Sequence, residues 1–212
     1  MTENGIVERS KQKPWENVYI LNVAEYEIEN ISDYLRKLVA LTAEKLNISI
    51  TVSCSEMGSA LQELPQLYKE AQRYLQYRLL FGNAFVLNKE RCAANEANTN
   101  TSYSARVEKK LLDGIRCSNL EIVTATLNSL REEFQQLRYE YVLANVIELV
   151  TKIKMCIGEK KDVIQSTEFA EMYPQILSAN TLPAMFEIIN AYLTKGLQID
   201  TYRDIFTDIR DQ

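Results

Sequence analysis

Residues 48–54 read Ile-Ser-Ile-Thr-Val-Ser-Cys, and this short stretch decides how the first half of the chain is interpreted. Apolar and polar side chains alternate strictly along it, so that one face holds Ile48, Ile50, Val52 and Cys54. A period of two residues is typical of a half-buried β-strand, because successive side chains of a strand point to opposite faces. The stretch therefore predicts a strand that covers a core on one side.

Helical patterns flank this strand on both sides. Residues 28–46 repeat apolar side chains at helical spacing, and residues 64–81 do the same, with a proline in the first turn and a glycine directly after the last. Beyond these helices lie short apolar stretches at residues 18–21 and 84–87, which are predicted strands. The resulting order, β-α-β-α-β, favours one sheet with helices packed against it.

The second half of the chain reads as helices only. Residues 93–101, Ala-Ala-Asn-Glu-Ala-Asn-Thr-Asn-Thr, hold no large apolar side chain, so residues 89–102 are predicted to be a linker. Short turns between amphipathic segments then predict an antiparallel bundle. Its expected helices are 103–116, 120–137, 139–157, 167–177 and 182–200. The predicted class is α+β and mostly α, with a flexible lead-in (1–14), an α/β unit (15–88), the linker and the bundle (103–212).

Composition excludes several classes of function. The formal net charge of −5 argues against a chain that grips nucleic-acid phosphates by itself, and the absence of histidine removes the commonest general base and metal ligand. The four cysteines are widely spaced and form no C-x-x-C pair, which favours buried thiols in a reducing cytoplasm over a zinc site. Neither a signal peptide nor an apolar run of roughly 20 residues is visible. We expect a cytoplasmic protein without membrane contact, metal or cofactor, and not an enzyme.

Several short motifs lie on the second predicted helix and on the strand that follows it. Residues 67–71 read Leu-Tyr-Lys-Glu-Ala, residues 77–78 read Tyr-Arg, and residues 82–86 read Gly-Asn-Ala-Phe-Val. Residues 109–116, Lys-Lys-Leu-Leu-Asp-Gly-Ile-Arg, lie in the first helix of the second half. Together these motifs resemble the central region of AraC-type transcription regulators of Gram-positive bacteria. In that region a degenerate GGDEF-type domain is followed by a helical stretch.

The resemblance extends from about residue 15 to residue 200, and it implies a regulatory module that relays a signal or mediates self-association. The GGDEF signature is absent, because its place reads Lys-Pro-Trp-Glu-Asn at residues 13–17, and the half of the domain that should precede it is missing. Cyclase activity is therefore not expected. A pair of helix-turn-helix motifs normally follows in this family and is not reached before Gln212. The resemblance thus implies a fragment of a longer regulator whose DNA-binding region lies outside this chain.

The helix predicted at residues 64–81 carries the first group of candidate site residues. Tyr74, Tyr77 and Phe81 share one face by their spacing of three and four residues. Such a face either lines a ligand pocket or a dimer seam, or it belongs to an ordinary core. Arg78 follows Tyr77 in the family-like motif, and it could bind an acidic ligand, hold a partner helix or pair with a nearby acid.

The helix predicted at residues 139–157 carries the second group, Val142, Val146 and Leu149. Its apolar side chains cover more than one stripe, which is typical of a helix that is either central in a bundle or shared with a partner. We therefore treat these three residues as candidates for a self-association interface.

Three closely spaced acids, Glu25, Glu27 and Glu29, precede the first predicted helix. They could hold a metal ion, but acidic residues are also typical of a helix N-terminus, and the second interpretation is favoured.

Three functions from different classes remain open. The first is a regulatory, signal-relay or dimerisation module of an AraC-like regulator. The second is a sensory domain that binds a small ligand in a pocket between the sheet and the bundle. The third, a residual nucleotide-using enzyme, is disfavoured because no glycine-rich phosphate-binding loop is present.

Overall fold

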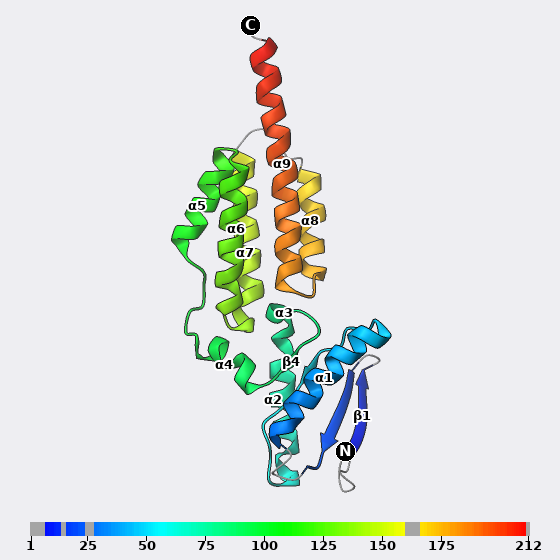
Figure 1. Ribbon diagram of the computed structural model, residues 1–212. Coiled ribbons are helices and arrows are strands. Elements are labelled where there is room, and N and C mark those ends of the chain that lie inside the picture. Colours follow the sequence, from blue (N-terminus) through cyan, green and yellow to red (C-terminus); the bar gives the residue numbers. More distant parts are fainter. Residues whose placement is uncertain (1–6, 14–15, 24–27, 160–165, 211–212) are drawn as a thin grey trace.

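The computed structural model describes residues 7–13, 16–23, 28–159 and 166–210, and Figure 1 shows how they are arranged. A long bundle of helices occupies one end, and a smaller part with short strands occupies the other. Helices make up most of the chain, which confirms the predicted α+β, mostly α class. The N-terminal end lies in the small part, and the C-terminal end lies beyond the far end of the bundle.

The first two strands form an antiparallel hairpin of their own. Strand β1 (Val7–Lys13) pairs with strand β2 (Glu16–Leu21), with a register irregularity near their connection. The predicted strand at residues 18–21 lies inside β2, but the prediction of a flexible lead-in over residues 1–14 is wrong for β1. A polar stretch can form a strand because pairing uses backbone hydrogen bonds, which leave no trace in an apolar pattern.

The other two strands form a second, parallel pair. Strand β3 (Val52–Ser53) lies beside strand β4 (Val86–Leu87), and the Cys54 amide donates to the Leu87 carbonyl at 2.9 Å. The single sheet that the sequence predicts is therefore wrong for the described residues, which form two separate pairs. The predicted strand at 48–54 shrinks to two residues, because β3 has a partner on one side only and Ile48 is half exposed.

Three helices complete the α/β unit. Helix α1 (Ile28–Leu46) has the predicted bounds. The helix predicted at 64–81 is divided at Tyr77 into α2 (Leu64–Gln76) and α3 (Arg78–Phe81), after a single 3₁₀ turn at Leu61–Glu63.

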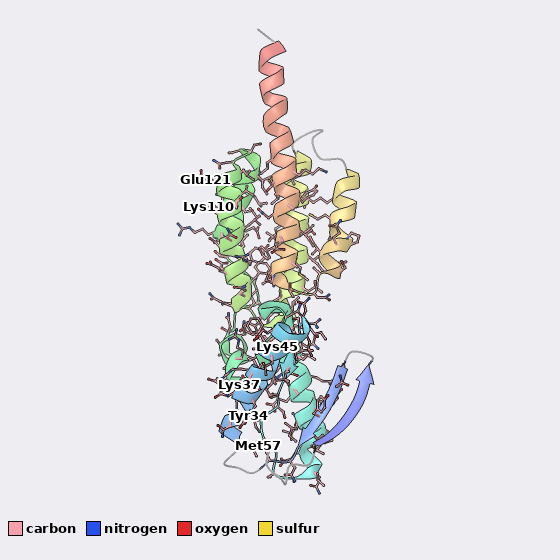
Figure 2. The ribbon with its side chains drawn as sticks, turned by 45° about the vertical axis from the view of Figure 1, so that its right-hand side comes forward. Tyr34, Lys37, Lys45, Met57, Lys110 and Glu121 are labelled. Atoms are coloured by element: carbon pink, nitrogen blue, oxygen red, sulfur yellow. The ribbon has the colours of Figure 1, made fainter. Side chains whose placement is uncertain are left out.

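Helix α1 is covered on one face only. Val39 is buried, whereas Tyr34, Leu38 and Leu41 expose 65%, 47% and 51% of their surface. Figure 2 shows Tyr34 and Lys37 on the outer side of this helix. Two short strand pairs are too small to cover a helix of this length on more than one face.

The predicted linker contains a helix. Helix α4 (Lys89–Ala97) begins at Asn88, whose side-chain oxygen accepts a hydrogen bond from the Arg91 amide at 2.9 Å. Alanine is a strong helix former, and Cys92 and Asn95 are buried against the rest of the protein. The linker prediction is wrong here because it rested on the lack of large apolar side chains, and a helix can also bury smaller and polar ones.

The remaining helices form an up-and-down bundle, as the sequence predicts (Figure 1). Their bounds are α5 (Ala105–Arg116), α6 (Leu120–Gln136), α7 (Tyr139–Glu159), α8 (Ser166–Ser178) and α9 (Leu182–Arg210). Helix α9 continues past the predicted end at residue 200 and projects beyond its neighbours. No helix within the described ranges combines the length and the apolar character that a membrane span requires.

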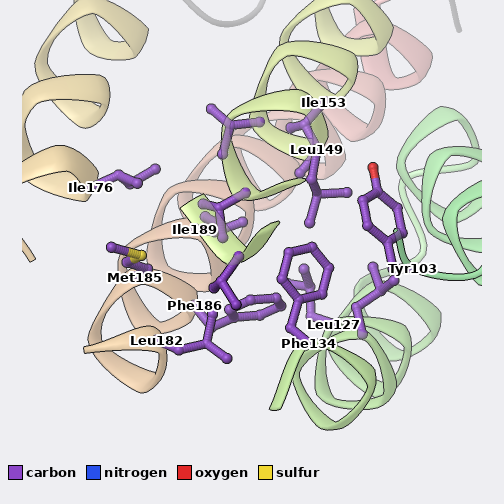
Figure 3. Close-up of a cluster of buried hydrophobic side chains, with 14 of the residues drawn as sticks. Tyr103, Leu127, Phe134, Leu149, Ile153, Ile176, Leu182, Met185, Phe186 and Ile189 are labelled. Carbon is purple, nitrogen blue, oxygen red and sulfur yellow. The ribbon is translucent and has the colours of Figure 1, made fainter. Parts of the chain in front are cut away.

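Phe134 of α6 lies at the centre of the bundle core, which Figure 3 shows. Its ring stacks on Tyr103 at a centroid distance of 4.9 Å and packs edge-on against Phe186 of α9 at 5.4 Å. Side chains from α7, α8 and α9 close the cluster around these rings. The bundle is therefore held by one continuous apolar core.

Candidate functional site

The α/β unit meets the bundle through a layer of aromatic side chains. Tyr77 lies between α2 and α3, and its ring packs edge-on against Tyr139, the first residue of α7, with 5.1 Å between centroids. Tyr77 also stacks on Phe81 at 6.3 Å. Tyr74 and Tyr77 each expose only 1% of their surface. Both tyrosines are thus core residues at the junction, and neither lines an open pocket or a seam between two copies.

Helix α4 caps the C-terminal end of α6. The Asn95 side-chain amide donates to the carbonyl oxygens of Gln135 and Leu137, at 2.7 and 2.8 Å. The Asn98 side-chain amide donates to the Gln136 carbonyl at 2.8 Å. The last carbonyls of a helix have no partners within that helix, so these two asparagines supply the donors that α6 lacks. We call these three bonds the asparagine cap; they join the α/β unit to the bundle.

An ion pair joins α4 to α2 beside the asparagine cap. Arg73 of α2 pairs with Glu96 of α4 at 3.1 Å, and its guanidinium lies 5.1 Å from the centroid of the Tyr74 ring. The Tyr74 hydroxyl donates to the Glu70 carboxylate at 2.9 Å. Burial, together with this hydrogen bond, raises the pKa of Tyr74 to about 12. Tyr74 therefore stays protonated at neutral pH and keeps its donor role.

Arg78 lies apart from the aromatic cluster, although it directly follows Tyr77 in sequence. Its side chain is exposed, and within the described residues its guanidinium has neither an ion pair nor a hydrogen-bond partner. Only its backbone takes part in the local structure, because the Arg78 carbonyl accepts from the Gly82 amide at 2.9 Å. Sequence proximity to the junction therefore does not place Arg78 in it.

The second group of candidate residues lies inside the bundle. Val142, Val146 and Leu149 of α7 are all fully buried, and Figure 3 shows Leu149 pointing into the core. A second copy of the chain cannot contact these side chains while the bundle is closed, so an interface made by them is corrected to a core role. Helix α7 is apolar on more than one stripe because it is central, which is one of the two readings of its sequence.

An open hollow of about 660 Å³ lies on the α/β side of the junction. Its walls come from α1, α4, β4 and the end of α3, and none of the described lining residues belongs to the helices α5–α9. A hollow is therefore present, but it does not lie between sheet and bundle, where the sequence reading places a ligand. Two cations, Arg36 and Arg91, and one carboxylate, Glu90, line it.

The cysteines and acids offer no metal centre in the part of the chain that the structure describes. Cys92 and Cys156 are buried, Cys54 is partly buried, and Cys117 is exposed. The expectation of buried thiols thus holds for two of the four and not for Cys117. Glu25 and Glu27 lie outside the described residues, as does the side chain of Glu29.

Sequence reasoning identified the aromatic layer but missed the residues that connect it to its surroundings. Asn95 and Asn98 lie in the predicted linker, and the carbonyls they cap are about 40 positions further along. Arg91 was missed for the same reason. An asparagine facing inward on a short alanine-rich helix is the only signal that could have pointed to the cap.

Comparison of this chain with protein-family models, with curated proteins and with solved structures finds no match in any of the three.

Proposed function

We propose that this chain is a non-catalytic regulatory module of an AraC-like transcription regulator. In this proposal it relays a signal from the α/β unit to the bundle in the cytoplasm, associates with a second copy, and acts on DNA through a region outside the chain. The single observation that carries the proposal is the junction, in which the Tyr77–Tyr139 contact and the asparagine cap connect both units. A displacement of α4, which pairs with α2 of the α/β unit through Glu96 and Arg73, changes the capping of α6 directly.

The order of elements also supports the resemblance. The hairpin β1–β2 is followed by helix, strand, helix and strand, which is the order that a degenerate GGDEF-type domain implies. Strand β1 ends at Lys13 and β2 begins at Glu16, so the position of the missing signature, residues 13–17, falls at the connection of the hairpin. A helical bundle then follows, as in the regulators that the sequence resembles.

A transcript measurement in the source organism tests this proposal. Deleting the coding region should change the transcript levels of a limited set of genes. The double substitution Asn95→Ala and Asn98→Ala should reproduce that change, because it removes the asparagine cap of α6 while leaving the shared apolar core intact. Asn128→Ala, an exposed position on α6, is the matched control and should leave transcripts unchanged.

Protein levels must be equal in all strains for this comparison. A deletion without effect on transcripts, or a cap variant that behaves like the unmodified protein, would contradict the relay.

A sensory domain for a small ligand is the second candidate function, and the hollow between α1, β4 and α4 favours it. Its volume falls in the range of small-molecule sites, which is roughly 300–1,000 Å³.

A further inference from the structure

The hollow between α1, β4 and α4 contains an arginine, Arg91, that has no carboxylate partner among the described residues. Arg91 lies in the first turn of α4, and its guanidinium carbon is 4.9 Å from the centroid of the Phe81 ring and 5.0 Å from that of Phe85. In the described ranges its side chain forms no ion pair and no hydrogen bond. Arg91 is thus held in place by two aromatic rings rather than by an acid.

This arrangement leaves the donors of Arg91 free. A guanidinium that lies over aromatic rings uses its faces, whereas its five N–H groups point outward along its edge. Because the rings already restrict the side chain, it loses less conformational freedom when it binds an acid than an unrestrained arginine does. The Arg91 guanidinium is therefore placed to donate hydrogen bonds to a planar or tetrahedral oxyanion.

A second cation lies on α1, which lines the same hollow. Arg36 pairs with Asp33 at 2.8 Å, and both side chains are more than half exposed. An exposed pair of this kind contributes little to stability, so Arg36 can exchange Asp33 for a bound anion. Among the described residues that line the hollow, Glu90 is the only carboxylate, and the two arginines outnumber it.

The rest of the lining is mostly apolar, with Asn88 and Asn95 as its uncharged polar members. Between the charged side chains lie the walls formed by Val39, Ala40, Ala43, Ala84, Val86 and Ala94. These small side chains leave room for an apolar body beside the charges, within the volume of about 660 Å³.

We propose that this hollow binds a small organic anion, a compact apolar body that carries one phosphate or carboxylate. Arg91 is its principal donor and Arg36 its second. The proposal rests on the second candidate function, the sensory domain, and names its ligand class and position.

The hollow shares two residues with the junction. Phe81 lies under the Arg91 guanidinium and also stacks on Tyr77, and Asn95 lines the hollow and caps α6. A ligand that displaces either residue therefore alters the contacts between the α/β unit and the bundle. This gives the bound anion a direct physical route to the helices.

Nuclear magnetic resonance of the whole chain tests the proposal, with phenyl phosphate, benzoate and inorganic phosphate as probes and benzyl alcohol as the uncharged control. The Arg91 side-chain Nε–H signal should shift with phenyl phosphate, with benzoate or with both, and the stronger binder identifies the preferred acid. Inorganic phosphate should bind more weakly because it lacks the apolar body, and benzyl alcohol should not shift this signal. The Asn95 side-chain amide should move along with Arg91.

Two substitutions locate the site. Arg91→Ala should weaken binding of the preferred acid, followed at the Asn95 side-chain amide, by roughly 10- to 100-fold, since a hydrogen bond to a charged group is lost. Arg106→Ala removes the same charge from the exposed face of α5 and should change the affinity by less than about twofold, because exposed charges at a distance are screened by salt.

Equal loss in both variants, no loss in Arg91→Ala, or no binding of either organic acid at millimolar concentration would each overturn the proposal. Such a failure leaves the relay proposal untouched, because the transcript test varies only Asn95 and Asn98 and measures no ligand.

Discussion

Ser118 holds a turn in a backbone conformation that is strained for any residue other than glycine. Helix α5 ends at Arg116, and Ser118 follows with a φ of 51°, in the left-handed region that glycine adopts most easily. The Asn119 amide donates to the Gly114 carbonyl at 2.9 Å, and the Ser118 amide donates to the Ile115 carbonyl at 3.1 Å. This pair of bonds is the Schellman arrangement, in which glycine is the preferred residue at the left-handed position.

Ser118→Gly is therefore expected to stabilise the protein. Removing the left-handed strain should raise the free energy of unfolding by about 0.5–1 kcal/mol, after the extra freedom of glycine in the unfolded chain is subtracted. Urea unfolding followed by circular dichroism measures the change. The control Ser129→Gly, in the middle of α6, should lower stability by about 0.5 kcal/mol, because glycine is a poor residue inside a helix. The same sign in both variants would contradict the explanation.

Buried acids of high pKa make the stability fall at alkaline pH. Burial raises the pKa of Cys92 from 9.0 to about 12, and that of Tyr74 from 10.0 to about 12. Above about pH 9 the unfolded chain loses these protons while the folded chain keeps them, so the unfolded state binds fewer protons and stability decreases as pH rises. Below that pH the contribution is fully present.

The urea midpoint should therefore stay nearly constant from about pH 7 to 8.5, where the chain has no histidine to titrate, and should fall between about pH 9 and 12. In the double variant Cys92→Ala and Tyr74→Phe the decline should be shallower, since two of the responsible groups are gone. An unchanged slope would show that other groups control the alkaline transition.

At the scale of single elements, local patterns predicted the helices far better than the strands. Helix α1 has the predicted bounds because the residues of this helix alone determine its apolar spacing and its two ends. The strand predicted at 48–54 forms over Val52–Ser53 only, since a strand exists where a partner lies beside it. Strand β1 was missed for the same reason, because its partner rather than its composition makes it a strand.

The candidate site shows the same division. Tyr74, Tyr77 and Phe81 could be named from their helical spacing, because a shared face needs no knowledge of the fold. Their role could not be predicted from the sequence, because it depends on Tyr139. This residue lies some 60 positions further along the chain, and its ring centroid is 5.1 Å from that of Tyr77. The clearest wrong prediction concerns helix α4. Asn95 is buried because it satisfies backbone carbonyls of α6, and no apolar pattern indicates such a contact.

At the scale of the whole molecule, the two units differ in how much apolar core each one has by itself. The described residues before α4 contribute only a few buried apolar side chains: Val39, Tyr74, Tyr77, Leu80 and Leu87. All of these except Val39 belong to the cluster that continues into the bundle. The α/β unit therefore shares the core of the bundle rather than having one of its own.

We therefore expect the bundle to fold without the α/β unit, but not the reverse. A fragment of residues 98–210 should be helical and unfold cooperatively, because it retains the core around Phe134. A fragment of residues 7–97 should lack a cooperative transition, since a chain of this size is marginal even with a complete core, and pairs of two short strands do not persist alone in water. Thermal unfolding followed by circular dichroism distinguishes these outcomes.

In the whole chain, Asn95→Ala with Asn98→Ala should split one transition into two, with the α/β unit unfolding first, whereas Asn128→Ala should leave a single transition. A cooperative 7–97 fragment would mean that the junction connects two independent domains, and that a relay through it needs a different physical basis.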